Sequence, residues 1–133
     1  MKIAETIAEV REQVRTWRKE GLAVGLVPTM GYLHEGHKSL IDRAVEENDR
    51  VVVSVFVNPI QFGPSEDLAS NPRDLKRDAA LCEAAGADLV FHPSDGEMYF
   101  DDFCTYVDID DLTKGLCGKT RPTHFRGVCT VVS

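Results

Sequence analysis

The sequence predicts an α/β fold, a Rossmann-like parallel sheet with helices on both faces, in one domain spanning residues 1–133. Short apolar runs at 22–28, 50–57 and 88–91 alternate with stretches of helical periodicity. The run at 50–57 is almost continuously apolar, which is typical of a parallel strand covered on both faces. Strands that alternate with helices favour a parallel sheet with right-handed crossovers.

The first predicted element is a helix from about Thr6 to Lys19. Thr6 and Glu9 have the spacing of a capping box, and apolar side chains then recur at helical intervals. Gly21 is the expected stop signal.

The strand at 22–28 ends at Pro28 and leads through a glycine-bearing loop into a second helix, 38–48. We expect the inner face of this helix to carry Leu40, Ile41 and Ala44.

The strand at 50–57 is followed by two prolines and a glycine, which forbid its continuation. A third helix is expected to begin with Pro72 in its first turn and to end at Gly86, before the strand at 88–91. Beyond Pro93 the pattern predicts an extra strand at 105–109.

The end of the chain has weaker patterns. Residues 110–116 are expected to form a helical turn or two, and an apolar stretch opens at Pro122 and is still running at Ser133.

The charge and composition exclude several classes of protein. With 15 Lys and Arg against 22 Asp and Glu, the net charge of -7 argues against general binding of nucleic acid or of an anionic membrane. The four cysteines form no C-x-x-C pair, so we expect free and mostly buried thiols. The chain starts without an apolar signal core, and the run near Val51 to Val57 is too short to span a bilayer, so we expect a cytoplasmic protein.

The candidate site lies where the first long strand meets the second helix. His34 and His37 flank Gly36 there, and a helix N-terminus with imidazole donors beside it is suited to bind phosphate. Two histidines beside a glycine are by default surface residues or residues whose hydrogen bonds are satisfied in the core. The position of this pair after a buried strand, at a helix start, favours a functional role. No carboxylate or cysteine cluster completes a metal site, and there is neither a G-x-S-x-G elbow nor a Walker A motif.

Two amides, Asn58 and Gln61, follow the strand at 50–57. The carboxyl ends of parallel strands meet at one edge of a sheet, where ligands bind. These amides either cap the turn or hydrogen-bond a small polar substrate. His92 is interpreted as structural and Lys38 as solvated.

Four acidic residues precede or begin the third helix. Their alternatives are assistance to a Mg²⁺ ion or a solvated position, and solvation is the prediction for most of them. They are Glu66, Asp67, Asp74 and Asp78.

Three segments together, 27–37 (VPTMGYLHEGH), 57–62 (VNPIQF) and 121–128 (RPTHFRGV), resemble the pantothenate synthetases. These are pantoate–β-alanine ligases of the H-x-G-H nucleotidylyltransferase-like superfamily, and the resemblance covers essentially the whole chain in order.

The resemblance implies a two-step, ATP-dependent ligation. Pantoate attacks the α-phosphate of ATP to give pantoyl adenylate and pyrophosphate, and β-alanine then displaces AMP to give pantothenate. His34 and His37 are the implied catalytic residues, with Mg²⁺ neutralising the triphosphate. The implied ATP-binding residues are Pro28, Thr29, Met30, Gly31, His34, Gly36 and His37. The implied pantoate-binding residues are Met30, Asn58, Gln61, Val131 and Val132.

The resemblance also implies a homodimer and a mobile gate at 63–71, where Asn71 replaces the tyrosine common in the family. The family continues beyond Ser133 with an ATP-binding lysine, a second pantoate-contacting glutamine, a serine- and arginine-bearing loop and a lid domain. We therefore expect the sheet and the active site of this chain to be incomplete at the carboxyl end.

Two alternatives stay open at this point. One is another H-x-G-H nucleotidylyltransferase, for which a phosphorylated acceptor would call for Arg or Lys near Asn58 and Gln61. The other is a non-catalytic nucleotide-binding fragment.

Overall fold

The computed structural model describes residues 1–63 and 73–133. They form two compact units: a sheet unit, residues 1–57 and 73–98, and a helical unit, residues 58–63 and 99–133. The predicted gate lies outside the described residues except for Gly63. The same holds for Glu66, Asp67, Asn71 and Pro72.

The sheet unit contains a parallel sheet in the order β1-β4-β3-β2, which confirms the predicted fold class. Its strands are β1 (Lys2–Ala4), β2 (Val24–Thr29), β3 (Arg50–Val55) and β4 (Leu89–Phe91). The carboxyl ends of β2 and β3 are aligned, with Thr29 opposite Val55. Phe56 and Val57 lie beyond the end of β3, so the predicted strand was two residues too long.

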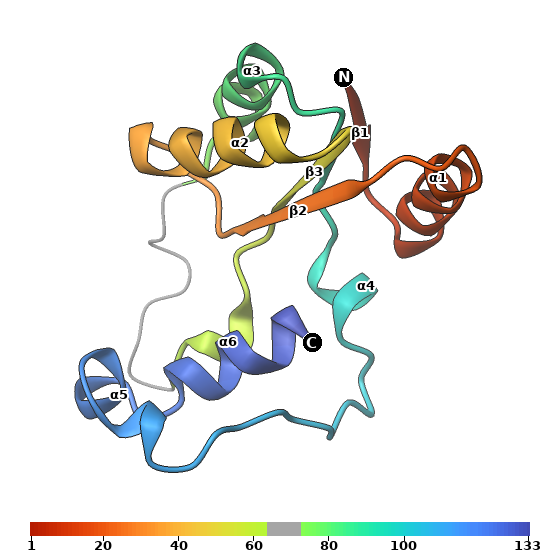
Figure 1. Cartoon of the computed structure of the whole chain (residues 1–133). Helices are drawn as coiled ribbons and strands as arrows, with labels where there is room; N and C mark the ends of the chain where they lie inside the picture. Colours follow the sequence, from red (N-terminus) through yellow and green to blue (C-terminus); the bar gives the residue numbers. More distant parts are fainter. Residues whose placement is uncertain (64–72) are drawn as a thin grey trace. The chain divides into compact units, whose positions relative to one another are not determined.

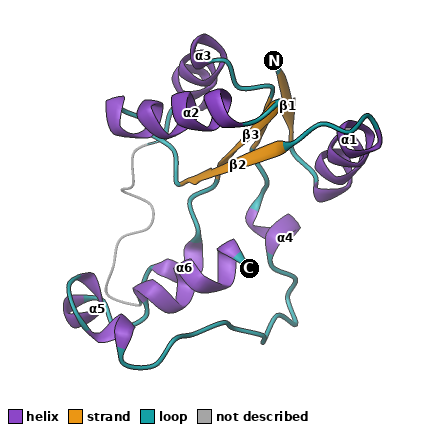
Figure 2. Ribbon diagram, in the orientation of Figure 1, coloured by secondary structure: helices purple, strands orange, loops and turns teal. Residues whose placement is uncertain are grey.

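Helices cover both faces of this sheet, as Figures 1 and 2 show. On one face, α2 (Glu35–Glu47) and α3 (Leu75–Ala85) contribute Ile41 and Cys82 to a core with Val51, Val53 and Val90. On the other face, α1 (Ile7–Lys19) packs its apolar stripe on Val52 and Leu89. A short helix, α4 (Asp95–Met98), follows β4.

Local signals account for the ends of α1 and α3. Thr6 caps α1 by accepting a hydrogen bond from the Glu9 N–H, as its spacing predicted. Asp74 caps α3 by accepting from the Arg77 N–H, and Gly86 ends it in the left-handed conformation (φ 97°).

Helix α2 begins at Glu35, three residues before the predicted start, because the side chain of His34 caps it. Its predicted inner face was partly wrong. Ile41 is fully buried, whereas Leu40 is 57% exposed, since it projects to one side of the contact with the sheet.

Strand β1 was not predicted. It is three residues long, and both Lys2 and Ile3 are exposed, so it lacks an apolar pattern. Pairing of Ile3 with Val90 on β4 makes it a strand.

The helical unit contains two 3₁₀ turns, η1 (Pro59–Gln61) and η2 (Leu112–Lys114), with α5 (Cys117–Thr120) and α6 (His124–Val132). The strand predicted at 105–109 was wrong. No strand is available there to pair with it among the described residues of this unit, and Val107 instead bonds the Thr130 side chain through its N–H (2.9 Å) and its carbonyl (3.3 Å).

The four cysteines are free, as predicted, but they are not mostly buried: Cys82 is buried, Cys129 is intermediate, and Cys104 and Cys117 are exposed. Within the described residues, no helix combines the length and the apolar character needed to span a membrane.

Candidate functional site

The N-terminus of α2 is capped by a pair of histidines. His34 Nδ1 accepts a hydrogen bond from the Gly36 N–H at 3.0 Å, and the His34 N–H donates to His37 Nδ1 at 3.2 Å. This is the reciprocal arrangement of a capping box, with imidazole rings in place of the usual hydroxyl and carboxylate. The two rings lie 4.1 Å apart between centroids.

The caps determine where the protons of the two rings lie. A neutral imidazole has one N–H, and a nitrogen that accepts a hydrogen bond carries no proton. Both Nδ1 atoms accept from backbone N–H groups, so both rings carry their proton on Nε2. The helix N-terminus therefore presents two Nε2–H donors in addition to its own partial positive charge, which is suited to an anion.

The pKa of His37 is held below its usual range, first by burial and second by the neighbouring His34 ring, while Asp78 opposes the shift. The neutral form, which the capping arrangement requires, is therefore the form present at neutral pH.

Gly36 leaves room for the ring that caps the helix, because the space beside its Cα is filled by His34. A Cβ at this position would lie 2.8 Å from Cε1 and 3.0 Å from Nδ1 of the His34 ring. The glycine is required because the capping imidazole lies against it.

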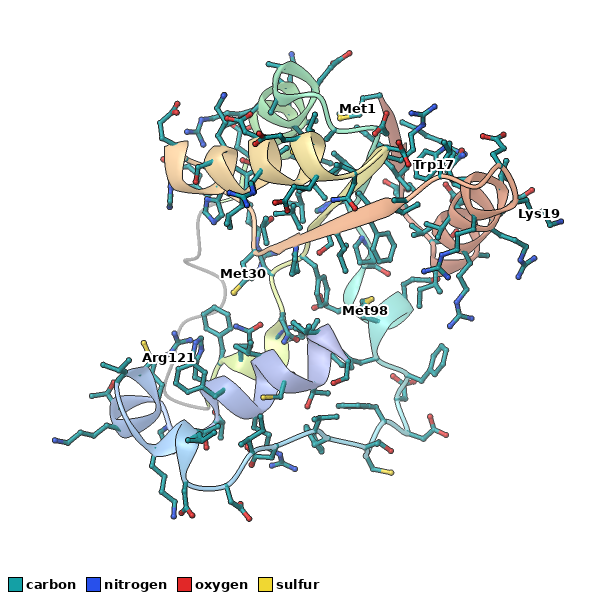
Figure 3. The ribbon with its side chains drawn as sticks, in the orientation of Figure 1. Met1, Trp17, Lys19, Met30, Met98 and Arg121 are labelled. Carbon is teal, nitrogen blue, oxygen red and sulfur yellow. The ribbon has the colours of Figure 1, made fainter. Side chains whose placement is uncertain are left out.

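The turn between β2 and α2 is held from inside the protein. Thr29 Oγ1 donates to the Ser54 carbonyl at 2.8 Å and accepts from the Gly31 N–H at 3.2 Å. Pro28 is exposed on β2, at the edge of the sheet, where its missing N–H is tolerated. Met30 lies just beyond the end of β2 (Figure 3).

Asp78 was placed wrongly among the mostly solvated acids. It is only 1% exposed, and its carboxylate accepts hydrogen bonds from the N–H groups of Tyr32 and Leu33. Sequence reasoning had one signal for its burial. Asp78 lies between Leu75 and Cys82 at helical spacing, so it shares the inner face of α3.

A pocket of about 290 Å³ lies in the sheet unit beyond the carboxyl ends of β3 and β4, beside the turn that follows β2. This is the edge of a parallel sheet where ligands bind. Its lining includes Met30, Gly31, Val55, Asp78 and His92. The His92 Nδ1–H donates to the Val55 carbonyl at 2.9 Å, a structural contact as predicted.

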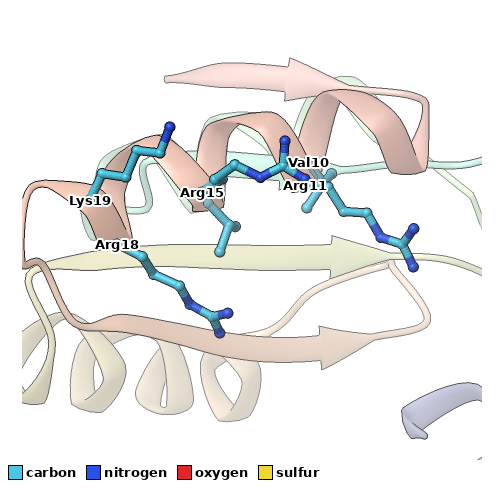
Figure 4. A pocket seen from close by; sticks show the side chains of 6 residues that line it. Val10, Arg11, Arg15, Arg18 and Lys19 are labelled. Carbon is cyan, nitrogen blue, oxygen red and sulfur yellow. The ribbon is translucent and has the colours of Figure 1, made fainter.

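A wider groove of about 580 Å³ runs along α1 and is lined by Val10, Val14 and four cationic side chains (Figure 4). It lies along α1, which covers the face of the sheet opposite to α2, and the arginine and lysine side chains around it are long and exposed. We therefore assign the candidate site to the edge of the sheet. Lys38 is also solvated, as predicted, and pairs with Asp42 at 2.8 Å.

The two predicted amides lie together in the helical unit. Asn58 Nδ2 donates to Gln61 Oε1 and to the Gly127 carbonyl, each at 3.0 Å, and Asn58 Oδ1 accepts from the Tyr99 hydroxyl at 2.7 Å. Asn58 is 1% and Gln61 5% exposed. The bond from Asn58 fixes which end of the Gln61 amide is the carbonyl, so the Gln61 Nε2–H₂ group is oriented as a donor.

Close packing of η1 on α6 depends on Gly127, which sequence reasoning did not single out. A Cβ on Gly127 would lie 2.7 Å from the Cα, Cγ and N atoms of Gln61. Further along α6, Val131 is partly exposed and Val132 is 58% exposed. Their assignment to the wall of a pantoate pocket stays a prediction.

Among residues 1–63 and 73–133, no group of three or more His, Cys, Asp or Glu side chains is arranged to hold a metal ion. Asp74 and Asp78, the described members of the acidic set, already accept hydrogen bonds from backbone N–H groups.

The fold and the capped helix define a class: parallel α/β domains in which a helix N-terminus suited to an anionic ligand lies beside the carboxyl ends of the strands. Comparison with known proteins then identifies the family. A family model described as pantoate-beta-alanine ligase matches residues 2–133, and the chain belongs to this family.

Curated relatives agree with this assignment. The chain is 61% identical over 133 residues to the pantothenate synthetase of Clostridium acetobutylicum, covering 100% of the chain and 47% of that protein. It is 62% identical to the pantothenate synthetase of Enterococcus faecalis, with the same coverage. The chain thus spans about half the length of these relatives.

Solved structures match as well. The pantothenate synthetase of Thermus thermophilus has a TM-score of 0.88 at 51% identity, covering 99% of this chain and 46% of that one. The pantoate-beta-alanine ligase of Francisella tularensis, solved with an ATP compound and β-alanine, has a TM-score of 0.86 at 39% identity, covering 99% of this chain and 51% of that one.

Proposed function

We propose that this chain belongs to an ATP-dependent ligase that condenses pantoate with β-alanine, and that it forms the amino-terminal, nucleotide-binding part of that enzyme. The observation that carries the proposal is the histidine-capped N-terminus of α2, where both Nδ1 atoms accept backbone hydrogen bonds and both Nε2–H groups are left as donors. Membership in the pantoate-beta-alanine ligase family supplies the reaction.

The reaction has two displacements. A carboxylate oxygen of pantoate attacks the α-phosphorus of ATP, the bond to the β-phosphate oxygen breaks, and pyrophosphate leaves. The amine nitrogen of β-alanine then attacks the acyl carbon, the bond to the phosphate oxygen breaks, and AMP leaves as the nitrogen loses a proton. Phosphoryl chemistry of this kind is catalysed mainly by positioning and by stabilisation of charge.

His34 and His37 act in the first displacement. Their Nε2–H groups and the N-terminus of α2 hold the phosphates of ATP and stabilise the negative charge that develops on the leaving pyrophosphate. The ATP site includes the turn of Pro28, Thr29, Met30 and Gly31 with Gly36, and the Met30 backbone contacts the reacting carboxylate.

Pantoate is bound through Gln61, whose amide is held as a donor by Asn58. A neutral amide suits a small hydroxy acid better than a phosphorylated acceptor, which favours this function over another nucleotidyl transfer. Asn58 lies beside the substrate, and Val131 and Val132 contribute apolar wall.

Mg²⁺ is part of the proposal as the partner of the ATP phosphates. It commonly keeps several waters and binds through substrate phosphates with one or two carboxylates. The described acidic side chains do not form a dedicated site, so the ion would enter with the nucleotide and neutralise its charge. Assembly as a homodimer and residence in the cytoplasm complete the proposal and rest on the family resemblance.

The test is pantoate-dependent exchange of labelled pyrophosphate into ATP, measured on the full-length gene product and on the 133-residue chain. We expect exchange in the full-length protein and none in the isolated chain. His34→Ala and His37→Ala should lower the exchange rate, whereas Arg43→Ala, a change on the exposed end of the same helix, should not. Absence of pantoate-dependent exchange in the full-length protein would reject the function.

Substrate contacts are tested separately by calorimetry. Gln61→Ala should weaken pantoate binding while ATP binding persists. Heat on titration with a phosphorylated acceptor, and none with pantoate, would instead indicate a different transferase.

A further inference from the structure

The turn that precedes His34 forms an anion-binding nest. Gly31 and Tyr32 both have positive φ angles, 84° and 51°. In this turn the successive backbone N–H groups of Tyr32 and Leu33 point into one concavity, an arrangement that binds a negatively charged group. Tyr32 adopts this conformation without being glycine, which is unfavourable unless other contacts hold it.

The occupant of the nest is the carboxylate of Asp78, from helix α3. Its Oδ2 accepts from the Tyr32 N–H and its Oδ1 from the Leu33 N–H, each at 2.8 Å. Asp78 is 1% exposed and Leu33 is fully buried, so the bond from the Leu33 N–H is shielded from water, and the bond from the Tyr32 N–H is partly shielded. Hydrogen bonds from backbone N–H groups to a shielded carboxylate are among the stronger ones in proteins.

Two further contacts fit the turn to this carboxylate. A Cβ on Gly31 would lie 3.3 Å from Asp78 Oδ2 and 3.1 Å from Val55 Cγ1, so a side chain there would press on the bond. The guanidinium of Arg77, the residue before Asp78, lies 4.9 Å from the centroid of the Tyr32 ring. Helix α3 therefore contacts both the backbone and the side chain of Tyr32.

We propose that Asp78 is a positioning residue for the histidine pair. Leu33 directly precedes His34, so the bond from the Leu33 N–H fixes the Tyr32–Leu33 peptide, which lies one residue before the cap of α2. Without the carboxylate, the buried Leu33 N–H and the partly buried Tyr32 N–H lose their acceptor and the turn relaxes. The rings of His34 and His37 then leave the orientation in which both Nε2–H groups face an anion. The proposal rests on the phosphate role given above and extends it to a residue on a different helix.

The test compares three proteins by NMR: the wild-type chain, Asp78→Asn and Asp88→Ala. Asp78→Asn keeps the shape but replaces one acceptor with an N–H₂ donor. Asp88→Ala is the matched control, because Asp88 Oδ2 accepts from the buried Val51 N–H at 2.8 Å and its loss also leaves a buried N–H unpaired. Asp88 precedes β4, at the opposite end of the strands from the histidines.

The readouts are amide hydrogen exchange and the ¹⁵N signals of the histidine rings, which report the tautomer. In Asp78→Asn we expect exchange at Tyr32 and Leu33 to rise about tenfold or more over that in Asp88→Ala, and the single Nε2-protonated tautomer to give way to a mixture. In the full-length gene product, pyrophosphate exchange should fall about a hundredfold in Asp78→Asn, since small misplacements of reacting groups have effects of this size. It should stay near wild type in Asp88→Ala.

Asp78→Glu gives a second measurement in case Asp78→Asn does not fold. It keeps the charge and both acceptors but displaces the turn by the length of a methylene, so the ring signals should shift in a folded protein. Unchanged exchange at Tyr32 and Leu33 and unchanged ring signals in a folded variant would overturn the proposal. Because these readouts need no catalysis, they stand even if the wild type shows no pyrophosphate exchange, which would reject the ligase function alone.

Discussion

Replacement of Gly36 by alanine should separate stability from ligand binding. The new Cβ would lie 2.8 Å from the His34 ring, closer than real contacts allow, so the imidazole must rotate away. Rotation breaks the bond between His34 Nδ1 and the Gly36 N–H and removes the cap of α2. Loss of an N-cap costs about 1 kcal/mol, whereas alanine in place of a helical glycine gains about 1 kcal/mol. The two terms cancel, so the unfolding free energy should change little.

Ligand binding has no such compensation. The rotated ring no longer directs its Nε2–H at the phosphates, and a hydrogen bond to a charged group contributes about 1.5–3 kcal/mol. The affinity for ATP should therefore fall by roughly tenfold to a hundredfold. Calorimetric titration with ATP and thermal unfolding, both on the full-length gene product, measure the two effects.

Gly96→Ala is the control for Gly36→Ala, because nothing lies within 4 Å of a Cβ at Gly96 in α4. It should leave ATP affinity unchanged. Wild-type affinity in Gly36→Ala would refute the role given to the His34 ring, and a large drop in its melting temperature would refute the cancellation of the two stability terms.

Three further predictions concern packing, protonation and thiol reactivity. Gly127→Ala should destabilise the protein by about 1–3 kcal/mol in denaturant unfolding, because its Cβ would overlap Gln61, whereas Gly115→Ala, with open space around it, should not; equal stability of the two would contradict the packing. The pKa of His37 is lowered in the fold, so its contribution to stability is present above the ordinary value of 6.5 and is lost as the pH falls through the lowered folded pKa. His37→Gln keeps a capping acceptor and should flatten this loss of stability between pH 7.5 and 5. An equal slope of stability against pH in the variant and the wild type would contradict this prediction. Burial raises the pKa of Cys82 to about 11, so mass mapping after thiol labelling at pH 8 should find Cys104 and Cys117 modified promptly and Cys82 only after unfolding, and prompt labelling of Cys82 would show that it is not shielded.

Elements with a local cause could be predicted from the sequence. Helix α1 begins where Thr6 indicates and helix α3 ends where Gly86 indicates, because caps and turn glycines act within a few residues. The buried strands β3 and β4 have apolar runs because both faces of a parallel sheet are covered.

Strands were predicted wrongly where their formation depends on a neighbouring strand. Residues 105–109 have the alternation of a strand, yet no strand lies beside them within the described part of their unit. Lys2–Ala4 have no such pattern and form β1 because β4 has a free edge. A strand forms only beside a hydrogen-bonded neighbouring strand, and the periodicity of one segment does not show whether such a neighbour is present.

The candidate site divides in the same way. The chain positions of the histidines, glycines and amides could be predicted, because a strand, a turn and a helix start follow from local pattern. Their geometry could not: that His34 caps its own helix, and that its ring displaces any side chain from Gly36, depends on φ and χ angles. The protonation of both rings on Nε2 follows only from those contacts.

Asp78 shows why tertiary contacts change the interpretation of a charged residue. An aspartate beside basic residues near a helix start is most often solvated, and a buried carboxylate without partners is costly. The partners are supplied by Tyr32 and Leu33, 46 and 45 residues earlier in the chain. No side-chain pattern in the sequence marks these two partners, because backbone N–H groups are the same in every non-proline residue. The positive φ of Tyr32 is unfavourable on its own and is held by contacts with α3, so neither half of this interaction can be inferred from its own segment of sequence.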